Sequence, residues 1–315
     1  MENTMDKKLV KVKNKSVSYA KWGYIFIIPF FLAYLIFTLY PQIKTIIFSF
    51  QEYWYEGVVP HGPAFNNFEN YKDLFTANEG EIMILKCLGN TIIMWVMGAV
   101  IQFLFSILLA LFFTSSRLNL KCTGFFKSVF YMPNLIMAAA FAFLFYAIFN
   151  SIGPVNQILQ GLGWTTENID FITGNKWSAR SLVAAMNLLM WFGNTTILLM
   201  AGIMGIDESL FESARVDGAS SNRVFFDITL PLLKPILVYV IITSMIGGLQ
   251  MYDVPSVLSK GKGTPNNTTK TLVMLLNDKL SMRNYGAAGA IAVILFVITG
   301  AFSIIVFKSI TKKDE

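Results

Sequence analysis

Six long stretches with few charges dominate this 315-residue sequence and restrict its fold more than any other feature. A helix needs about 20 apolar residues to cross the hydrocarbon core of a bilayer, and each stretch is about that long or longer. Because backbone groups inside lipid must satisfy one another, we expect an all-α integral membrane protein with six transmembrane helices. The predicted spans cover residues 22–43, 87–114, 128–149, 181–205, 232–254 and 284–307.

The composition agrees with a membrane protein. Hydrophobic residues make up 55% of the chain and charged residues only 14%, whereas a typical soluble domain has about 25% charged residues. The third uncharged run continues to residue 166, long enough for a helix and a further re-entrant or interfacial segment. The first apolar run is too long for a signal peptide and lacks a small-residue cleavage site, so we expect it to be retained as a span.

Lys and Arg predict which side of the membrane each end of the chain faces. Cytoplasmic segments carry an excess of these residues. Placing both ends inside puts 15 of the 25 on that side, six of them before the first span. Segment 258–285 departs from the rule, with five basic residues and one acid. We therefore expect a multi-pass protein of the cytoplasmic membrane with both termini cytoplasmic: a basic tail at 1–21, a transmembrane domain at 22–310 and a short tail at 311–315.

Motifs for catalysis or metal binding are not found in this sequence. One histidine, His61, cannot form a histidine cluster, and Cys87 and Cys122 lack the spacing of a CxxC site. The glycine-rich string at 259–267 lacks the upstream glycine and the Ser or Thr of a nucleotide-binding loop. We expect no catalytic residue, no metal and no cofactor on this chain. Its basic residues flank apolar runs, so they do not indicate nucleic-acid binding.

One polar loop, residues 206–231, has the pattern of two short helices joined at a glycine. Asp207 can cap the first helix, Gly218 can end it, and Ser220 or Ser221 can cap the second, which would run to Pro231. The stretch 206–230 holds five acids and two bases, an unusual charge for a cytoplasmic segment. A solvated helix on the membrane surface would instead be rich in Lys and Arg. We therefore expect a protein partner for this loop.

The loop 206–231 resembles the signature loop of binding-protein-dependent ABC importer permeases. That pattern is Glu-Ala-Ala, three residues, Gly, nine residues and Ile-x-Leu-Pro, and Ser213 is the one departure from it. The resemblance implies a coupling helix that docks on a cytoplasmic ATPase subunit. The coupling residues expected here are Glu212, Ser213, Ala214, Arg215, Asp217, Gly218, Ile228, Leu230 and Pro231.

Other segments resemble the sugar-transporter branch of that family, the maltose and glycerol-3-phosphate type. They are FYMP at 130–133, FNSIGPVN at 149–156 and MYD at 251–253. The resemblance implies the type I ABC importer permease fold and a transport subunit without enzymatic activity. Implied partners are a second homologous permease, two ATPase subunits that bind ATP and Mg, and an extracytoplasmic solute-binding protein.

The resemblance also implies a substrate class and leaves alternatives open. The expected solute is a carbohydrate, in particular an oligosaccharide, moved by alternating access. A non-sugar solute such as a glycerol phosphate ester would suit the same machine. A secondary carrier is less favoured because the span interiors show no ionisable residue. A membrane scaffold or an enzyme subunit would have no need for the spacing of the loop 206–231.

Polar and aromatic residues in the fourth and fifth spans are candidates for the substrate pathway. A sugar needs hydrogen bonds for its hydroxyls and aromatic faces for its C–H patches. Asn187, Trp191 and Asn194 share one helical face. The fifth span adds Ser244, Gln250 and Tyr252. For any one of these residues, a polar contact between helices is an equally good interpretation.

Overall fold

The computed structural model describes residues 20–77, 81–115 and 120–311. Residues 1–19 of the predicted basic tail and residues 312–315 of the predicted C-terminal tail lie outside these ranges. The chain divides into two units, Met1–Ile46 and Ile47–Glu315, and each is described by itself. Within the described residues, six helical runs are long and apolar enough to cross a membrane.

The first unit contributes one such run. Helix α1 (Ala20–Tyr34) continues through a π-helical turn, η1 (Leu35–Leu39), into α2 (Tyr40–Ser49). The last residues of α2, from Ile47, belong to the second unit. The apolar side chains of this run are exposed; Phe37, for example, keeps 79% of its surface. A helix that is apolar all round and unburied within its own chain is typical of a segment that faces lipid or other helices.

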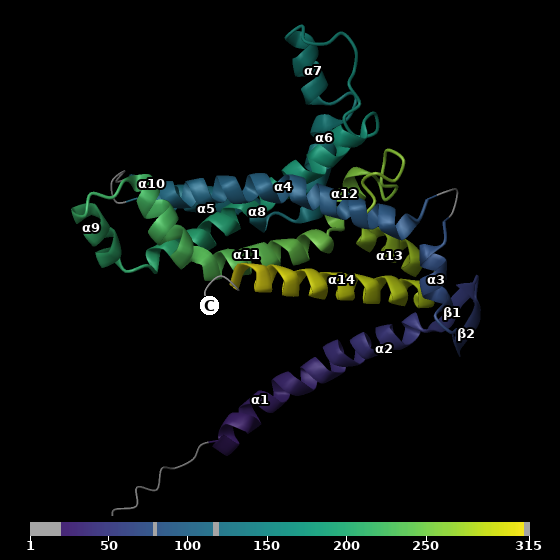
Figure 1. Cartoon of the computed structure of the whole chain (residues 1–315). Coiled ribbons are helices and arrows are strands. Elements are labelled where there is room, and N and C mark those ends of the chain that lie inside the picture. The colour runs from purple at the N-terminus through teal and green to yellow at the C-terminus, as the bar shows by residue number, and fades with distance from the viewer. Residues whose placement is uncertain (1–19, 78–80, 116–119, 312–315) are drawn as a thin grey trace, which may run out of the picture. The chain divides into compact units, whose positions relative to one another are not determined.

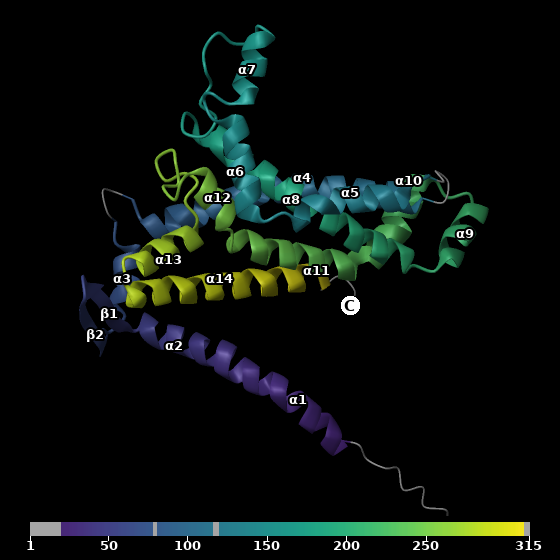
Figure 2. The same ribbon diagram turned by 180° about the vertical axis from the view of Figure 1, so that it is seen from behind.

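Four long helices and one broken helix form the membrane part of the second unit (Figures 1 and 2). The long helices are α4 (Met83–Thr114), α8 (Lys176–Met204), α11 (Leu230–Leu249) and α14 (Tyr285–Thr311). The broken one is α5 (Thr123–Leu135) followed by α6 (Ala138–Phe149). In both views α4, α5, α8, α11 and α14 run beside one another, whereas α6 leaves them at an angle.

The third run apolar enough to cross a membrane is Ala138–Gly161, whereas the sequence predicted 128–149; a break between α5 and α6 separates residues 123–135 from it. Ile136 has an extended backbone, Met137 is also non-helical (ψ 130°), and Pro133 lies in the last turn of α5. Proline removes one backbone donor and weakens the turn that contains it. Because Ile136 and Met137 are as apolar as their neighbours, hydropathy does not reveal the break. It turns α6 away from α8, so that α6 packs mainly on α12 (Asp253–Leu258).

Close contact between α5 and α8 depends on one glycine. A Cβ atom on Gly193 would lie 1.9 Å from the backbone oxygen of Phe130. Asn134 of α5 donates a hydrogen bond to the Met190 carbonyl of α8 over 3.2 Å. Any side chain at position 193 would therefore push these two helices apart. Small residues that let backbones approach are the usual means by which helices pack in membranes.

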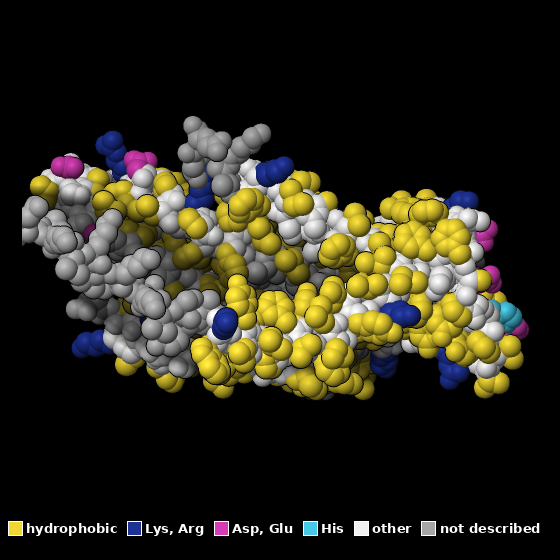
Figure 3. Space-filling view, turned by 90° about the horizontal axis from the view of Figure 1, so that it is seen from below, with side chains coloured by type: hydrophobic (Ala, Val, Ile, Leu, Met, Phe, Trp, Pro, Cys, Tyr) yellow, Lys and Arg dark blue, Asp and Glu magenta, His cyan; other side chains and the backbone are white. Residues whose placement is uncertain are grey.

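The ends of the second unit carry different structures. At one end, called the hairpin end, β1 (Gln51–Glu56) pairs antiparallel with β2 (Val59–Phe65), next to α3 (Glu69–Phe75) and α13 (Leu272–Ser281). The hairpin and α3 fill most of the segment 51–86, whose fold the sequence left open. At the other end, called the loop end, lie α9 (Glu208–Val216) and α10 (Ser221–Val224). Figure 3 shows hydrophobic side chains over most of one face, with acidic side chains toward both ends and the histidine at one of them.

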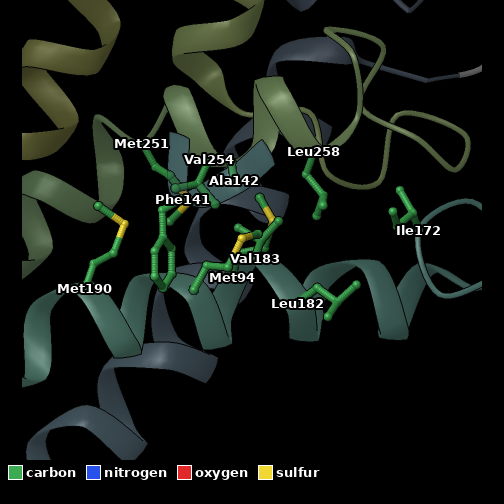
Figure 4. Packing of buried hydrophobic residues seen from close by; sticks show 11 residues of the cluster. Met94, Phe141, Ala142, Ile172, Leu182, Val183, Met190, Met251, Val254 and Leu258 are labelled. Atoms are coloured by element: carbon green, nitrogen blue, oxygen red, sulfur yellow. The ribbon is translucent and has the colours of Figure 1, made fainter. Parts of the chain in front are cut away.

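The largest buried cluster lies toward the hairpin end, where α4, α6, α8 and α12 meet (Figure 4). Its members include Met94, Phe141, Met186 and Met251, each at most 8% exposed. Helix α7 (Pro154–Gly161) follows α6 beyond this cluster. The cluster thus joins α6 and α12 to α4 and α8 at this end of the unit.

Candidate functional site

The loop 206–231 begins with a capped helix, as its sequence predicts. The Asp207 carboxylate accepts a hydrogen bond from the Ser209 N–H over 3.0 Å at the start of α9. That backbone hydrogen bond, with a second from the Ser209 side chain, lowers the pKa of Asp207 below its ordinary value. The ionised carboxylate is therefore the form that caps the helix, and it also suits the positive end of the helix dipole.

Gly218 ends α9 in the left-handed conformation. Its φ angle is +74°, and no atom lies within 4 Å of where a Cβ would stand. The Gly218 N–H donates to the Arg215 carbonyl (3.1 Å), and the Ala219 N–H donates to the Ala214 carbonyl (2.9 Å). These two bonds form a Schellman motif, which satisfies carbonyls that the helix leaves unpaired. Glycine is therefore favoured at this position for its backbone conformation alone.

The second helix of the loop does not stop at Pro231, and the prediction of a separate short helix was wrong. Ser220 caps α10 by accepting from the Arg223 N–H (3.3 Å). The chain then continues through a π-helical turn, η2 (Phe225–Thr229), directly into α11. A proline ring collides with the carbonyl four residues earlier in a regular helix. The π-helical turn before Pro231 relieves that contact, as η1 does before Pro41, so the helix is continuous.

The loop presents its signature residues unevenly. Glu212, Ser213, Arg215, Asp217, Gly218 and Pro231 are exposed, Ile228 and Leu230 are half-buried, and Ala214 is buried. The Ser213 hydroxyl donates to the Ser209 carbonyl four residues earlier (2.9 Å). Its polar group is thus used within α9, so Ser213 replaces the alanine of the pattern without presenting a new donor. Asp227 is paired with Arg223 over 3.3 Å, which leaves α9 as the acidic part of the loop.

Exposed apolar side chains accompany these charges. Val216 keeps 88% of its surface, Phe226 62% and Leu210 43%. Apolar groups beside acidic ones on a well-capped helix are typical of a surface that receives a partner protein. The geometry of α9 therefore supports a docking role.

A cavity of about 330 Å³ lies between α4, α8 and α11, within the second unit. Polar and aromatic side chains alternate around it with small ones. The lining residues are Trp95, Gly98, Ala99, Gln102, Asn187, Trp191, Asn194, Thr195, Leu198, Tyr239, Val240, Thr243, Ser244, Gly247, Gly248 and Met251. None of these sixteen side chains is charged at neutral pH.

Four of the six residues predicted for the substrate pathway line this cavity: Asn187, Trp191, Asn194 and Ser244. The spacing along α8 places the first three on one wall, and Ser244 comes from α11 opposite. Gln250 and Tyr252 are not among the lining residues. Gln250 is exposed at the end of α11, and the Tyr252 hydroxyl accepts a hydrogen bond from Asn277 over 2.8 Å. The structure thus brings four predicted residues together around the cavity and leaves Gln250 and Tyr252 outside its lining.

The sequence analysis did not predict that α4 forms one wall of this cavity. Trp95 and Gln102 stand seven residues apart on one face of α4, a spacing that indicates a shared surface. Gln102 is 6% exposed and donates to the Thr195 hydroxyl over 2.8 Å. Trp95 donates from its indole nitrogen to the Ser244 hydroxyl over 3.2 Å. The sequence did contain a signal for this wall, because an aromatic residue and a polar residue, Trp95 and Gln102, share one helical face of the span.

Among the residues that the structure describes, no group of three or more His, Cys, Asp or Glu side chains is placed to hold a metal ion. One buried cation was overlooked in the sequence. Arg180, in the first turns of α8, is only 8% exposed. Its guanidinium lies toward the hairpin end and does not line the cavity.

Comparison with known proteins places this architecture in a family. Residues 102–313 match the model of the binding-protein-dependent transport system inner membrane component. The arabinooligosaccharides transport system permease protein AraP of Bacillus subtilis is 30% identical over 288 residues, covering 90% of this chain and 87% of that protein. The lactose transport system permease protein LacF of Rhizobium radiobacter is 28% identical over 285 residues, covering 89% and 91%.

A solved structure supports the fold. A chain of the bacterial alginate ABC transporter, in complex with an alginate pentasaccharide-bound periplasmic protein, superposes with a TM-score of 0.74. The sequences are 21% identical, and the match covers 91% of this chain and 92% of that one. With a membrane bundle, the signature loop and a family match over two thirds of its length, this chain belongs to the inner membrane components of binding-protein-dependent transport systems.

Proposed function

We propose that this chain is one membrane-spanning half of an ATP-driven importer and that its solute is a neutral carbohydrate, in particular an oligosaccharide. The relatives named for arabinooligosaccharides and lactose support a sugar. The uncharged cavity between α4, α8 and α11 is the observation that carries the proposal. It offers amide and hydroxyl groups for sugar hydroxyls and the rings of Trp95, Trp191 and Tyr239 for C–H faces.

The absence of charge in the cavity lining argues against a glycerol phosphate ester. Moving an anion from water into a low-dielectric site without a counter-charge is costly. Phosphate sites are normally built from Arg, Lys or helix N-termini, and none of the sixteen lining residues is Arg or Lys. A neutral solute loses only hydrogen bonds to water, which Asn187, Asn194 and Thr243 can replace.

The loop 206–231 would transmit the work of ATP hydrolysis. In this proposal two cytoplasmic ATPase subunits bind ATP and Mg, and one of them receives α9. The capped ends and exposed acidic and apolar groups of α9 support that docking role. Closure of the ATPase pair would move α9 and, through the continuous helix from α10 into α11, a wall of the cavity. Alternating access then follows from motion of α11 against α4.

The remaining partners complete the machine. A second homologous permease would close the open side of the cavity, and an extracytoplasmic solute-binding protein would deliver the sugar at the hairpin end. The loop end and both termini would then face the cytoplasm. A secondary carrier remains the weaker alternative. Such a carrier would use an ionisable residue inside a span, and among the described residues Arg180 is a buried cation in such a position. Its Nε and Nη2 atoms, however, donate hydrogen bonds to Thr268 and Asn90, which do not line the cavity.

Reconstitution tests this proposal. The chain would be assembled in proteoliposomes with its partner permease, ATPase and binding protein, and ATP hydrolysis would be measured against a panel of neutral oligosaccharides and glycerol phosphate esters. We expect at least one neutral oligosaccharide, and no phosphate ester, to stimulate hydrolysis. Stimulation by a phosphate ester alone would overturn the assignment of a neutral solute, and stimulation by no carbohydrate would overturn the substrate class.

A further inference from the structure

Arg180 is a buried cation held without a carboxylate among the described residues. Its Nη2 donates to Asn90 Oδ1 of α4 over 2.6 Å, and its Nε donates to the Thr268 carbonyl over 3.0 Å. The guanidinium also lies over the ring of Trp177, 5.2 Å from the ring centre. Burying a charge is costly unless other groups compensate it. The hydrogen bonds of Arg180 therefore join α8 to α4 and to the loop that contains Thr268.

Asn90 extends the same clamp. Its amide nitrogen donates to the carbonyls of Asn267 (2.6 Å) and Lys270 (3.1 Å), while its oxygen accepts from Arg180. Asn90 is 3% exposed, so these groups have little access to water. Together, Arg180 and Asn90 fix the carbonyls of residues 267, 268 and 270. The segment 259–271, here called the clamped loop, is thereby held on the hairpin ends of α4 and α8.

The clamped loop is tied in turn to the cavity. Thr271, which is fully buried, donates from its hydroxyl to the Met251 carbonyl over 2.8 Å. Met251 lines the cavity, and its sulfur accepts a contact from the Asn187 amide at 3.5 Å. Helix α11 has already ended at Leu249, and α12 begins at Asp253. Met251 thus lies in a short non-helical link whose position is set by the groups that contact it.

Figure 4 shows how the Met251 side chain is packed. Met251 points into the buried cluster with Met190, Phe141 and Val254. The side chain is therefore packed while its carbonyl is held by Thr271. A displacement of the clamped loop would act on a residue that belongs both to the cavity wall and to the core between α6, α8 and α12.

We propose that Arg180 and Asn90 are positioning residues for transport: they anchor the clamped loop, and through Thr271 this loop fixes Met251 at the cavity edge nearest the hairpin end. The transport consequence rests on the function proposed above, but the structural link does not. Arg180 itself does not touch the solute. It acts through the loop, so its removal should disturb the cavity edge before it disturbs the membrane bundle.

Thiol labelling tests the structural link without any transport measurement. In a full chain carrying Cys87→Ala and Cys122→Ala, Met251→Cys would be labelled with a membrane-impermeant maleimide. Loss of a buried hydrogen bond should raise the labelling rate about tenfold in Arg180→Met and Thr271→Val. Thr271→Ser, which keeps the hydroxyl, should stay near the parent rate. So should Lys262→Met, which removes an exposed charge from the same loop.

The proposal would be overturned by an unchanged labelling rate in Arg180→Met or in Thr271→Val, or by an equal rise in Lys262→Met. Thr271→Val keeps the test decisive if Arg180→Met fails to insert. The second readout is the ATP consumed per solute imported by the full complex. We expect Arg180→Met to raise this ratio and Arg180→Lys to restore part of it. A proportional fall in hydrolysis and uptake, with the ratio unchanged, would mark Arg180 as merely structural.

If no wild-type complex imports a carbohydrate, the proposed function fails, while the labelling result still decides whether the clamp positions Met251.

Discussion

The indole nitrogen of Trp95 donates a hydrogen bond to the Ser244 hydroxyl over 3.2 Å, joining α4 to α11 across the cavity wall. The contact is possible because position 248 is a glycine. A Cβ atom there would lie 2.1 Å from Cδ1 of the Trp95 ring. In the proposed mechanism α4 and α11 move against each other, so this contact lies at a surface that transport must open and close.

Gly248→Ala should therefore impair transport strongly. The added methyl group would force the Trp95 ring or α11 to shift, at a cost of about 1–3 kcal/mol. We expect slower uptake and a lower unfolding temperature of the detergent-solubilised chain. Gly300→Ala is the matched control, because no atom lies within 4 Å of its Cβ position and Gly300 does not line the cavity. Equal behaviour of the two variants would contradict the role of the Trp95 contact.

Trp191→Ala should reduce uptake about three- to tenfold, the range expected when one aromatic face is lost from a binding surface. Assembly with the ATPase should be unaffected, since Trp191 lies in the cavity and not in the loop 206–231. Leu189→Ala serves as control, since Leu189 is exposed on the same helix but does not line the cavity. Uptake measured in vesicles with equal amounts of assembled complex checks this. Wild-type uptake by Trp191→Ala would remove it from the pathway.

Gly218→Ala should weaken ATPase docking through backbone strain alone. Its φ of +74° is disfavoured for alanine by about 1–2 kcal/mol, and no neighbouring atom would be struck. Gly218→Asn should retain more docking, because asparagine tolerates this conformation better. The amount of ATPase recovered per permease in a pull-down measures the effect. If Ala and Asn behave alike, the left-handed turn is not what docking requires.

The cap at Asp207 predicts how docking of the loop 206–231 should depend on pH. The pKa of Asp207 is lowered by the hydrogen bond from the Ser209 N–H, so its stabilisation of α9 is fully present above the ordinary carboxyl pKa and is lost as the pH falls through the lowered value. ATPase docking should hence be insensitive to Asp207 protonation between about pH 6 and 8. Asp207→Ala should weaken docking about twofold or more throughout that range, and Asp207→Asn, also a good cap, should weaken it less.

Docking of wild type that falls between pH 8 and 6 while Asp207→Asn stays constant would contradict this interpretation of the cap.

Local features of this chain were predictable from its sequence. The spans follow from long apolar runs, and the cap at Asp207 and the turn at Gly218 follow from residues a few positions apart. Asn187, Trp191 and Asn194 share a helical face, which spacing alone reveals. The family pattern then pointed to the ATPase, a partner that periodicity cannot identify.

Features that depend on packing between distant segments were not predictable in this way. The break at Ile136 and Met137 lies within an unbroken apolar run. Trp95 became part of the cavity only through the approach of α11 at Gly248. The burial of Arg180 was not predicted, because its partners, Asn90 and the Thr268 carbonyl, lie about 90 residues away in each direction. Tertiary contacts decide each of these outcomes.

Uptake of labelled neutral oligosaccharide into proteoliposomes is the most direct measurement of what this chain does. The complex would be assembled with wild-type chain and with a chain whose α9 residues 208–216 are replaced by Gly and Ser. The wild-type complex should accumulate sugar in the vesicle lumen only when ATP is in the lumen, on the cytoplasmic side of the complex, and the binding protein is outside. The replacement should abolish that accumulation. Sugar accumulation that continues without ATP, or that survives loss of α9, would contradict an ATP-driven importer coupled through this loop.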